Sequence, residues 1–418
     1  MLSAKQSYPS SALLDPAQAV EQEVERLRHC LRPGMRVALG VGSRGITGLQ
    51  RMVGALVRKL QAMGTHPFIV PAMGSHGGAT PEGQTELLAE YGITETALGV
   101  PIRAAMEADL IGTTPEGVKA FCSIEALGSD AIILVNRIKP HTDFAGRLGS
   151  GILKMAVIGL GKRTGAANFH VAASQWGYEE VLRSVSRVVL AKAPVIGGLA
   201  IIENQRHETC RLAAIGRSEI EMREEALFME AKRLMPRLPF DDIDLLIVDR
   251  IGKNLSGAGL DPNIIGRSVH GYSSFLGQKD LPAPRIKRIF VRDLTPETHG
   301  NAIGIGFADI TTTRLVNAID KRATYVNALT ALTPNGAKIP IHFDTDQEAL
   351  SMALQSVGIA DTRQARVVRI ADTLSLERLE VSEACAAECT SSQGLEIKQG
   401  PEPIRWNGSG NLIDFPSM

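Results

Sequence analysis

Short apolar runs alternate with helical periodicities along the first half of the chain. Two runs, residues 35–41 and 131–138, have the continuous apolar character of a strand buried on both faces. Residues 64–73 supply a turn and a further strand, and residues 195–204 are also predicted as a strand. Between residues 41 and 64, apolar side chains recur with the three-and-four spacing of one helical face: Leu49, Met52, Val53, Leu56, Val57, Leu60 and Met63. Further helices are expected over 177–193 and after Thr80, the predicted N-cap, with Pro81 in the first turn. The alternation predicts an α/β domain with a largely parallel sheet, whose catalytic loops follow the carboxyl ends of its strands.

The second half repeats this alternation after a charged helix over 218–239. Strands are expected at 242–254, 285–294, 339–343 and 365–374, and helices at 309–320 and 346–358. We therefore predict an N-terminal α/β catalytic and cofactor-binding domain (1–240) and a C-terminal α/β domain (241–390), with the active-site cleft between them. The tail (391–418) is rich in turn-forming residues, and we expect it to pack back on the N-terminal domain.

Length and composition agree with two soluble domains. The 418 residues exceed what one hydrophobic core usually serves, and 45 basic residues balance 45 acidic ones, which predicts neither a nucleic-acid nor a membrane partner. No signal peptide and no apolar run of about 20 residues is recognisable. Five scattered cysteines suit reduced thiols and a cytoplasmic location. Cys385 and Cys389 could share a helix face, but two soft ligands alone do not predict a metal site.

Four glycine-containing segments carry the candidate chemistry. They hold Arg44 (GSRGITG), His76 (MGSHGGAT), His141 (KPHTDFAG), and Lys154 with His170 (ILKMAVIGLGKRTGAANFH), and we predict that all four are loops. The glycines around His76 would let main-chain amides approach an anion at the start of the next helix. The alternative is that they only form a tight turn, because the segment matches neither a Walker loop nor a dinucleotide fingerprint.

Two histidines at the ends of buried strands favour proton transfer. Imidazoles exchange protons near neutral pH, and His76 and His141 could serve opposite faces of one substrate carbon. Lys154 lies in an apolar run, where a lysine is costly unless it is paired, modified or extended to solvent. His170 alone does not make a metal site, and the zinc-protease pattern HExxH is absent.

The segments PAMGSHGGATPEGQ, NRIKPHTDF, LKM and AANFH together resemble the nickel-dependent lactate racemase family, over about residues 36–370. In the second domain, GLDPN resembles the aspartate-and-asparagine loop of that family. The resemblance implies two α/β domains closing over a nickel pincer nucleotide, a nicotinate-derived cofactor. It also implies site roles: acid and base for His76 and His141, cofactor tether for Lys154, nickel ligand for His170, substrate-carboxylate binding for Arg44, and cofactor-phosphate binding for Ser75, Gly77 and Gly78.

The chain departs from the lactate enzyme after LDPN. Ile264, Ile265 and Gly266 follow, where the lactate enzyme has a tyrosine and a glutamine before a substrate-binding lysine. Lys253 or Arg267 would then bind the substrate, which we expect to be a 2-hydroxy acid other than lactate. Attachment of the cofactor through Lys154 could be covalent or non-covalent.

The sequence thus predicts an isomerase: a racemase or epimerase of a 2-hydroxy acid, acting by reversible hydride transfer to the nickel pincer nucleotide. The enzymes that synthesise this cofactor would be its partners. Another reaction on the same cofactor, of dehydrogenase or lyase type, is the alternative. A cofactor-binding protein without racemase activity is a third interpretation, which the paired histidines disfavour because storage needs no acid–base pair.

Overall fold

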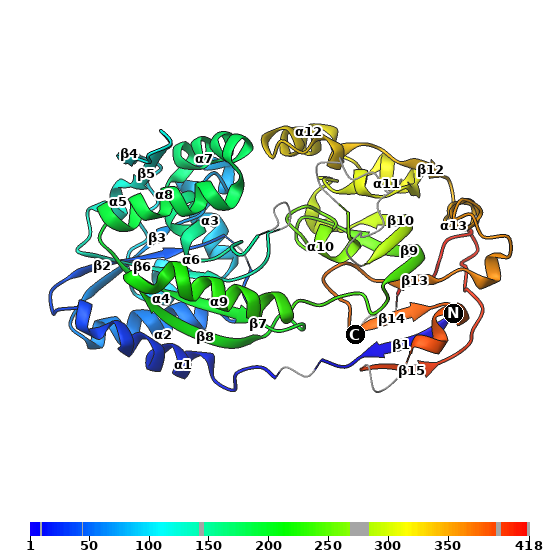
Figure 1. The fold of residues 1–418 in the computed structure, drawn as a ribbon, viewed down its shortest axis with the longest axis horizontal. Helices are drawn as coiled ribbons and strands as arrows, with labels where there is room; N and C mark the ends of the chain where they lie inside the picture. Colours follow the sequence, from blue (N-terminus) through cyan, green and yellow to red (C-terminus); the bar gives the residue numbers. More distant parts are fainter. Residues whose placement is uncertain (9–10, 44, 142–145, 268–283, 390–393, 416–418) are drawn as a thin grey trace. The chain divides into compact units, whose positions relative to one another are not determined.

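The computed structural model describes residues 1–8, 11–43, 45–141, 146–267, 284–389 and 394–415. Arg44 lies outside the described residues. The chain divides into two compact units, Ser10–Met235 and Met1–Pro9 with Pro236–Met418. Each unit has its own sheet (Figure 1). None of the helices in these ranges is long and apolar enough to cross a membrane.

The N-terminal unit is built on a five-stranded sheet in the order β3-β2-β6-β7-β8. Its strands are β2 (Arg36–Val41), β3 (His66–Pro71), β6 (Ala131–Arg137), β7 (Val195–Glu203) and β8 (Thr209–Gly216). The first four pair in parallel and β8 is antiparallel to β7. The expected α/β unit with a largely parallel sheet is confirmed.

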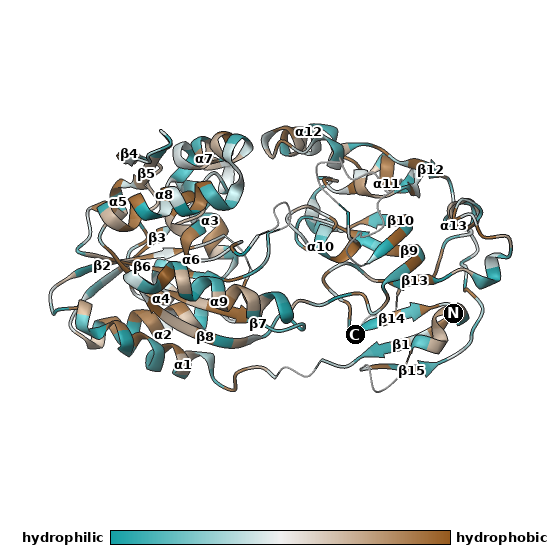
Figure 2. Ribbon diagram, viewed as in Figure 1, coloured by the Kyte–Doolittle hydropathy of each residue, from teal (hydrophilic) through white to brown (hydrophobic). Residues whose placement is uncertain are grey.

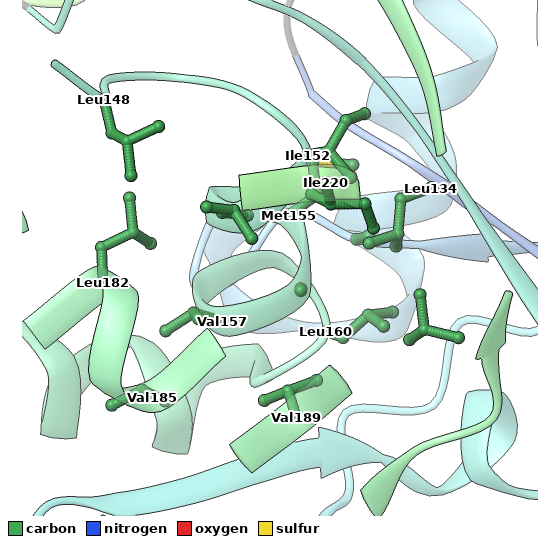
Figure 3. Packing of buried hydrophobic residues seen from close by; sticks show 14 of the residues in the cluster. Leu134, Leu148, Ile152, Met155, Val157, Leu160, Leu182, Val185, Val189 and Ile220 are labelled. Carbon is green, nitrogen blue, oxygen red and sulfur yellow. The ribbon is translucent and has the colours of Figure 1, made fainter. Parts of the chain in front are cut away.

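Helices cover both faces of this sheet, so its strands are apolar on both sides. Val37 and Leu39 pack in a core with α1 (Pro16–Val24) and α2 (Leu49–Ala62), whereas Ala38 and Leu134 pack in a second core on the other face (Figure 1). Figure 3 shows this second core, where side chains of α8 (Tyr178–Lys192) and α9 (Ile220–Arg233) meet those of the 152–160 segment.

The remaining elements of the unit flank this framework. They are α3 (Pro81–Glu90), α4 (Glu95–Leu98), α5 (Ile124–Leu127) and an antiparallel hairpin of β4 (Ala108–Thr113) and β5 (Lys119–Ser123). Thr80 caps α3 as predicted, because its Oγ1 accepts a hydrogen bond from Gly83 N at 3.1 Å.

The segment that carries Lys154 and His170 was predicted as a loop, and that interpretation is wrong. It forms α6 (Ile152–Lys154), a π-helix (Met155–Gly159) and α7 (Lys162–Trp176). Its glycines allow close packing: a Cβ on Gly159 would lie 2.6 Å from the carbonyl oxygen of Ala72. A glycine-rich stretch therefore marks a tightly packed helical run here, which is the alternative to a turn.

The C-terminal unit has an eight-stranded sheet in the order β12-β11-β10-β9-β13-β14-β1-β15. Five neighbours pair in parallel: β9 (Asp242–Ile251), β10 (Arg285–Leu294), β11 (Ile310–Thr312), β12 (Ile341–Phe343) and β13 (Val367–Ile370). The antiparallel strands are β14 (Arg378–Val381), β1 (Leu2–Gln6) and β15 (Leu395–Gln399), and they are largely hydrophilic in Figure 2.

Two expectations about the ends of the chain differ from the structure. The N-terminal strand β1 lies in the C-terminal unit, and the described tail residues 394–415 belong to that same unit. The reason is strand pairing, because β1 fills the position between β14 and β15 and supplies hydrogen bonds to both. The helices of this unit are α10 (Pro262–Ile265), α11 (Thr313–Asn317), α12 (Lys321–Thr330) and α13 (Asp346–Gln355). The helix expected from residue 309 begins only at Thr313, because the preceding residues form β11.

Candidate functional site

Three neighbouring strands of the N-terminal unit end at one edge of the sheet, and each is followed by a segment with candidate chemistry. Strand β2 leads to Ser43, β3 to His76 and β6 to His141. From β2 the chain continues to β3 on one side, and β6 joins on the other side, so β2 marks the point where the strand order reverses. Ligands of α/β sheets bind at such switch points. The axes of β3 and β6 are two strand spacings apart, roughly 10 Å.

His76 is held by a hydrogen bond between its Nδ1 and the hydroxyl of Ser43. Tyr91 supports this pair, because its hydroxyl donates to the main-chain oxygen of Ser43 at 3.0 Å. The loop itself is fixed from behind by Gln84, a buried side chain whose Nε2 donates to Gly74 O at 2.9 Å and to His76 O at 3.3 Å. The imidazole is exposed while its support is buried, which is the arrangement of a side chain placed for contact with a ligand.

The glycines beside His76 form a tight turn that also exposes main-chain donors. Gly77 has φ +62°, and a Cβ there would lie 2.5 Å from the carbonyl carbon of Gly83 in the first turn of α3. The N–H groups of Ser75, Gly77 and Gly78 have no acceptor among the described residues. Three open donors before a helix N-terminus fit a phosphate group.

His141 follows β6 in a segment that is closed by main-chain hydrogen bonds. Lys139 and Ser150 exchange two of these bonds at 2.9 Å each. The His141 ring lies 5.0 Å from the ring of Tyr178, centroid to centroid, and the Tyr178 hydroxyl donates to Gly149 O at 3.3 Å. Tyr178 begins α8, so a helix of the core orients the His141 ring.

His170 lies on α7, exposed, one residue after the buried Phe169. The two rings meet edge to face with centroids 5.8 Å apart, and Phe169 meets Tyr178 in the same way at 5.2 Å. His141, Tyr178, Phe169 and His170 therefore form a continuous series of ring contacts. The structure thus brings His141 and His170 into one neighbourhood.

Lys154 ends α6 and is half-buried. The start of α6 is held by Glu224 of α9, whose Oε2 accepts a hydrogen bond from Leu153 N at 3.0 Å. Burial raises the pKa of Glu224 to about 7. Asn136 of β6 also donates to Gly151 O at 3.0 Å, so the turn that carries Lys154 is attached to the sheet.

The buried lysine of this segment is Lys162, which is not among the site residues predicted from the sequence. Its side chain has no exposed surface, and burial lowers its pKa to about 8. Its Nζ donates to Pro71 O at 2.8 Å and to Gln84 Oε1 at 3.2 Å. The glycine-rich GLGKRTG stretch around it was a signal, because close backbone packing leaves little route to solvent.

The predicted substrate residues of the C-terminal unit already have partners. Arg267 donates to Phe307 O and to Asp309 Oδ2, both at 2.6 Å, and Lys253 Nζ donates to the side-chain oxygen of Asn327. A substrate carboxylate at Arg267 would compete with Asp309. Substrate binding by Lys253 and Arg267 stays a prediction.

No three His, Cys, Asp or Glu side chains form a metal-ligand group within the described ranges. A nickel ion on His170 would then need donors from a bound organic group. An exposed imidazole on α7, a half-buried lysine on α6 and open main-chain N–H groups after β3 are residue types that fit such a metal–nucleotide group.

Residues 7–180 match the lactate racemase N-terminal domain family. Among solved structures, the lactate racemase apoprotein from Thermoanaerobacterium thermosaccharolyticum matches over 89% of this chain and 94% of its own, with 16% identity and a TM-score of 0.55. A crystal structure of a protein from Thermotoga maritima matches over 84% of this chain and 92% of its own, with 14% identity and a TM-score of 0.53. No curated protein sequence matches significantly.

The fold is thus that of a two-unit α/β protein of the lactate racemase type. Residues 7–180 therefore resemble the lactate racemase N-terminal domain family, and the chain shares the fold of the lactate racemase apoprotein. This relationship supports a racemase-type or related function.

Proposed function

We propose that the chain is a racemase or epimerase of a 2-hydroxy acid, with His76 and His141 as its acid–base pair and a nickel pincer nucleotide as its cofactor. The observation that carries the proposal is the position of the two histidines. They follow β3 and β6, on either side of the switch-point strand β2, in the part of the chain that matches the lactate racemase domain.

Two bases suit inversion at a hydroxyl-bearing carbon. One imidazole takes the hydroxyl proton from one enantiomer, and the other takes it from the mirror-image substrate. Each histidine is then general base in one direction and general acid in the other. The hydrogen on C2 is not acidic, and when bound the cofactor supplies a hydride acceptor for it.

The chain offers a separate group for each part of the cofactor. Lys154 would hold the nicotinate-derived portion, and His170 would donate an imidazole nitrogen to nickel. The open N–H groups of Ser75, Gly77 and Gly78 would hold its phosphate.

A substrate other than lactate is supported by the C-terminal unit. Ile264 and Ile265 are 2% and 1% exposed and belong to the apolar interior, so they supply no polar contact to a substrate. Arg44 would bind the substrate carboxylate, with Lys253 or Arg267 as the second contact.

The test uses holoprotein produced together with the cofactor-synthesising enzymes and given single enantiomers of a panel of 2-hydroxy acids. We expect one acid to be inverted, as measured by chiral chromatography, and His76→Asn and His141→Asn each to lose at least ~100-fold in rate. His66→Asn is the matched control, because His66 begins the strand that His76 follows, at the opposite edge of the sheet. Oxidised product without inversion would identify a dehydrogenase, and an elimination product a lyase. Full activity in either site variant would remove that histidine from the acid–base pair.

The nickel assignment has a readout that is independent of turnover. His170→Ala should lose bound nickel, measured by elemental analysis of the purified holoprotein, and keep its fold because the His170 side chain is exposed. His66→Asn should keep its nickel. Full nickel occupancy in His170→Ala would show that another residue is the ligand.

A further inference from the structure

The network around Lys162 connects the two helical segments that flank the candidate site. Lys162 is the first residue of α7, the helix that carries His170, and its Nζ reaches the end of β3 at Pro71 and the side chain of Gln84 on α3. Gln84 extends the hydrogen-bond network to the His76 loop, because its Nε2 donates to the main-chain oxygens of Gly74 and His76. One buried amine and one buried amide therefore join α7 to the His76 loop.

The main chain at Lys162 has an unusual conformation. Its φ is +53°, in the left-handed region, which is unfavourable for a non-glycine residue. The residue also has no exposed surface. Its side-chain hydrogen bonds offset both costs, and strain of this kind persists where the surrounding structure imposes it.

The donors and acceptors balance for an uncharged amine. Such an amine has two N–H groups, and Pro71 O and Gln84 Oε1 accept one each. An ammonium would add a third N–H donor and a positive charge, and no carboxylate among the described residues makes a hydrogen bond with it. Burial lowers the pKa of Lys162 to about 8, so the uncharged amine predominates only above that pH, and the ammonium makes the same two contacts at neutral pH.

We propose that Lys162 is a positioning residue for His76: through Gln84 it fixes the main chain of the His76 loop and so aligns the imidazole with Ser43. The inference rests on the proposed acid–base role of His76 for its catalytic consequence. Its structural part concerns only the hydrogen-bonded chain from Lys162 to the loop.

The experiment measures the His76 ring directly in the cofactor-free protein. Selective ¹⁵N labelling of histidine gives the tautomer and the pKa of each imidazole by NMR, and the His76→Asn variant assigns the His76 signals. Lys162→Met keeps the length of the side chain but removes both hydrogen bonds, and we expect it to shift the tautomer balance or pKa of His76. Gln84→Glu should do the same, because it retains the acceptor for Lys162 but removes the donors to Gly74 O and His76 O.

Val189→Ala is the control for loss of stability alone. Val189 is fully buried on α8 in the same unit and is not part of the network, so its truncation should leave the His76 signals unchanged. Unchanged His76 signals in folded Lys162→Met would overturn the proposal. If Lys162→Met does not fold, Gln84→Glu decides: shifted His76 signals support the proposal and unchanged ones overturn it.

In the loaded enzyme, Lys162→Met should lower kcat by about 10- to 100-fold, because a loop misplaced by about 1 Å weakens proton transfer far more than binding. KM and nickel content should stay within about twofold of wild type. If the wild-type protein inverts no 2-hydroxy acid, the proposed function fails, but the NMR measurement still decides the positioning role.

Discussion

Two buried titratable residues of the N-terminal unit have pKa values that move toward neutrality from opposite sides. Burial raises the pKa of Glu224 from 4.5 to about 7, with Arg183 as the charge that opposes the shift. Because the folded pKa is the higher one, the folded state binds more protons between these values. The contribution of Glu224 to stability is therefore complete below pH 4.5 and is lost as the pH rises through 7.

Glu224→Gln should remove this pH dependence while keeping an acceptor oxygen for Leu153 N. Wild type should lose roughly 3 kcal/mol of unfolding free energy between pH 4.5 and 7 from this residue, and the variant should not. Urea unfolding at a series of pH values measures the difference. Parallel pH profiles for the two proteins would show that Glu224 does not titrate in this range.

For Lys162, the contribution to stability changes with pH in the opposite direction. Burial lowers its pKa from 10.5 to about 8, against the attraction of Glu125, Cys122 and Glu107. The unfolded state binds more protons between these values, so the contribution of Lys162 to stability increases from pH 8 to 10.5. Lys162→Met should flatten this rise in the same urea experiment, and an unaltered rise would contradict the assignment.

For the two lysines of this segment, Lys154 and Lys162, the sequence does not predict which side chain is buried. The apolar run ILKMAVIGLGK predicts Lys154 as the site lysine, but Lys162, eight residues later, is the lysine whose side chain is fully buried. Both lie among apolar residues and glycines, so local composition does not distinguish them. The distinction depends on partners from elsewhere, Pro71 and Gln84, whose positions are set by the sheet.

At the scale of elements, the sequence predicted most strands and helices of the N-terminal unit but not the course of its central helical run. The periodic apolar face of α2 and the cap of α3 are local features, which is why they could be predicted. A straight α-helix would place Lys154 and His170 about 24 Å apart. The π-helix and the left-handed residue Lys162 interrupt the helix, and no local periodicity predicts such a break.

Gly159 should be essential to the packing of this run. A Cβ there would lie 2.6 Å from Ala72 O, a main-chain atom that cannot rotate away, so Gly159→Ala should destabilise the protein by ~1–3 kcal/mol. Gly216→Ala is the control, because nothing lies within 4 Å of its added Cβ and its φ is −71°. Thermal unfolding compares the two variants, and equal melting temperatures would show that the run can shift at no cost.

At the scale of the whole molecule, long-range pairing determined what the sequence could not predict. β1 lies between β14 and β15, which come from the other end of the chain. No local pattern in residues 2–6 predicts that these strands are its partners. The tail is likewise held by buried charged side chains. Arg292 and Arg369 both form salt bridges with Asp249. Arg292 also donates a hydrogen bond to Leu412 O, and Arg369 donates one to Ile413 O.

Removing the shared carboxylate should release this tail. Asp249→Ala leaves two buried guanidinium groups without that carboxylate, and a broken buried pair typically costs ~3–5 kcal/mol. We expect faster hydrogen exchange in residues 404–415 and a lower melting temperature. Asp361→Ala is the control, because Asp361 pairs with a highly exposed arginine and should change stability by less than ~1 kcal/mol. Unchanged exchange in the tail of Asp249→Ala would show that the tail is held by other contacts.

The most direct test of the proposed reaction follows the hydrogen on C2. Holoprotein in ordinary water is given one enantiomer of the inverted 2-hydroxy acid, deuterated at C2, and the product is analysed by NMR and chiral chromatography. We expect the inverted product to retain its deuterium, because in the proposed mechanism the C2 hydrogen would move as hydride and His76 and His141 would transfer only the hydroxyl proton. Inverted product with protium at C2 would show that a base removes the C2 hydrogen as a proton, which contradicts the proposed mechanism.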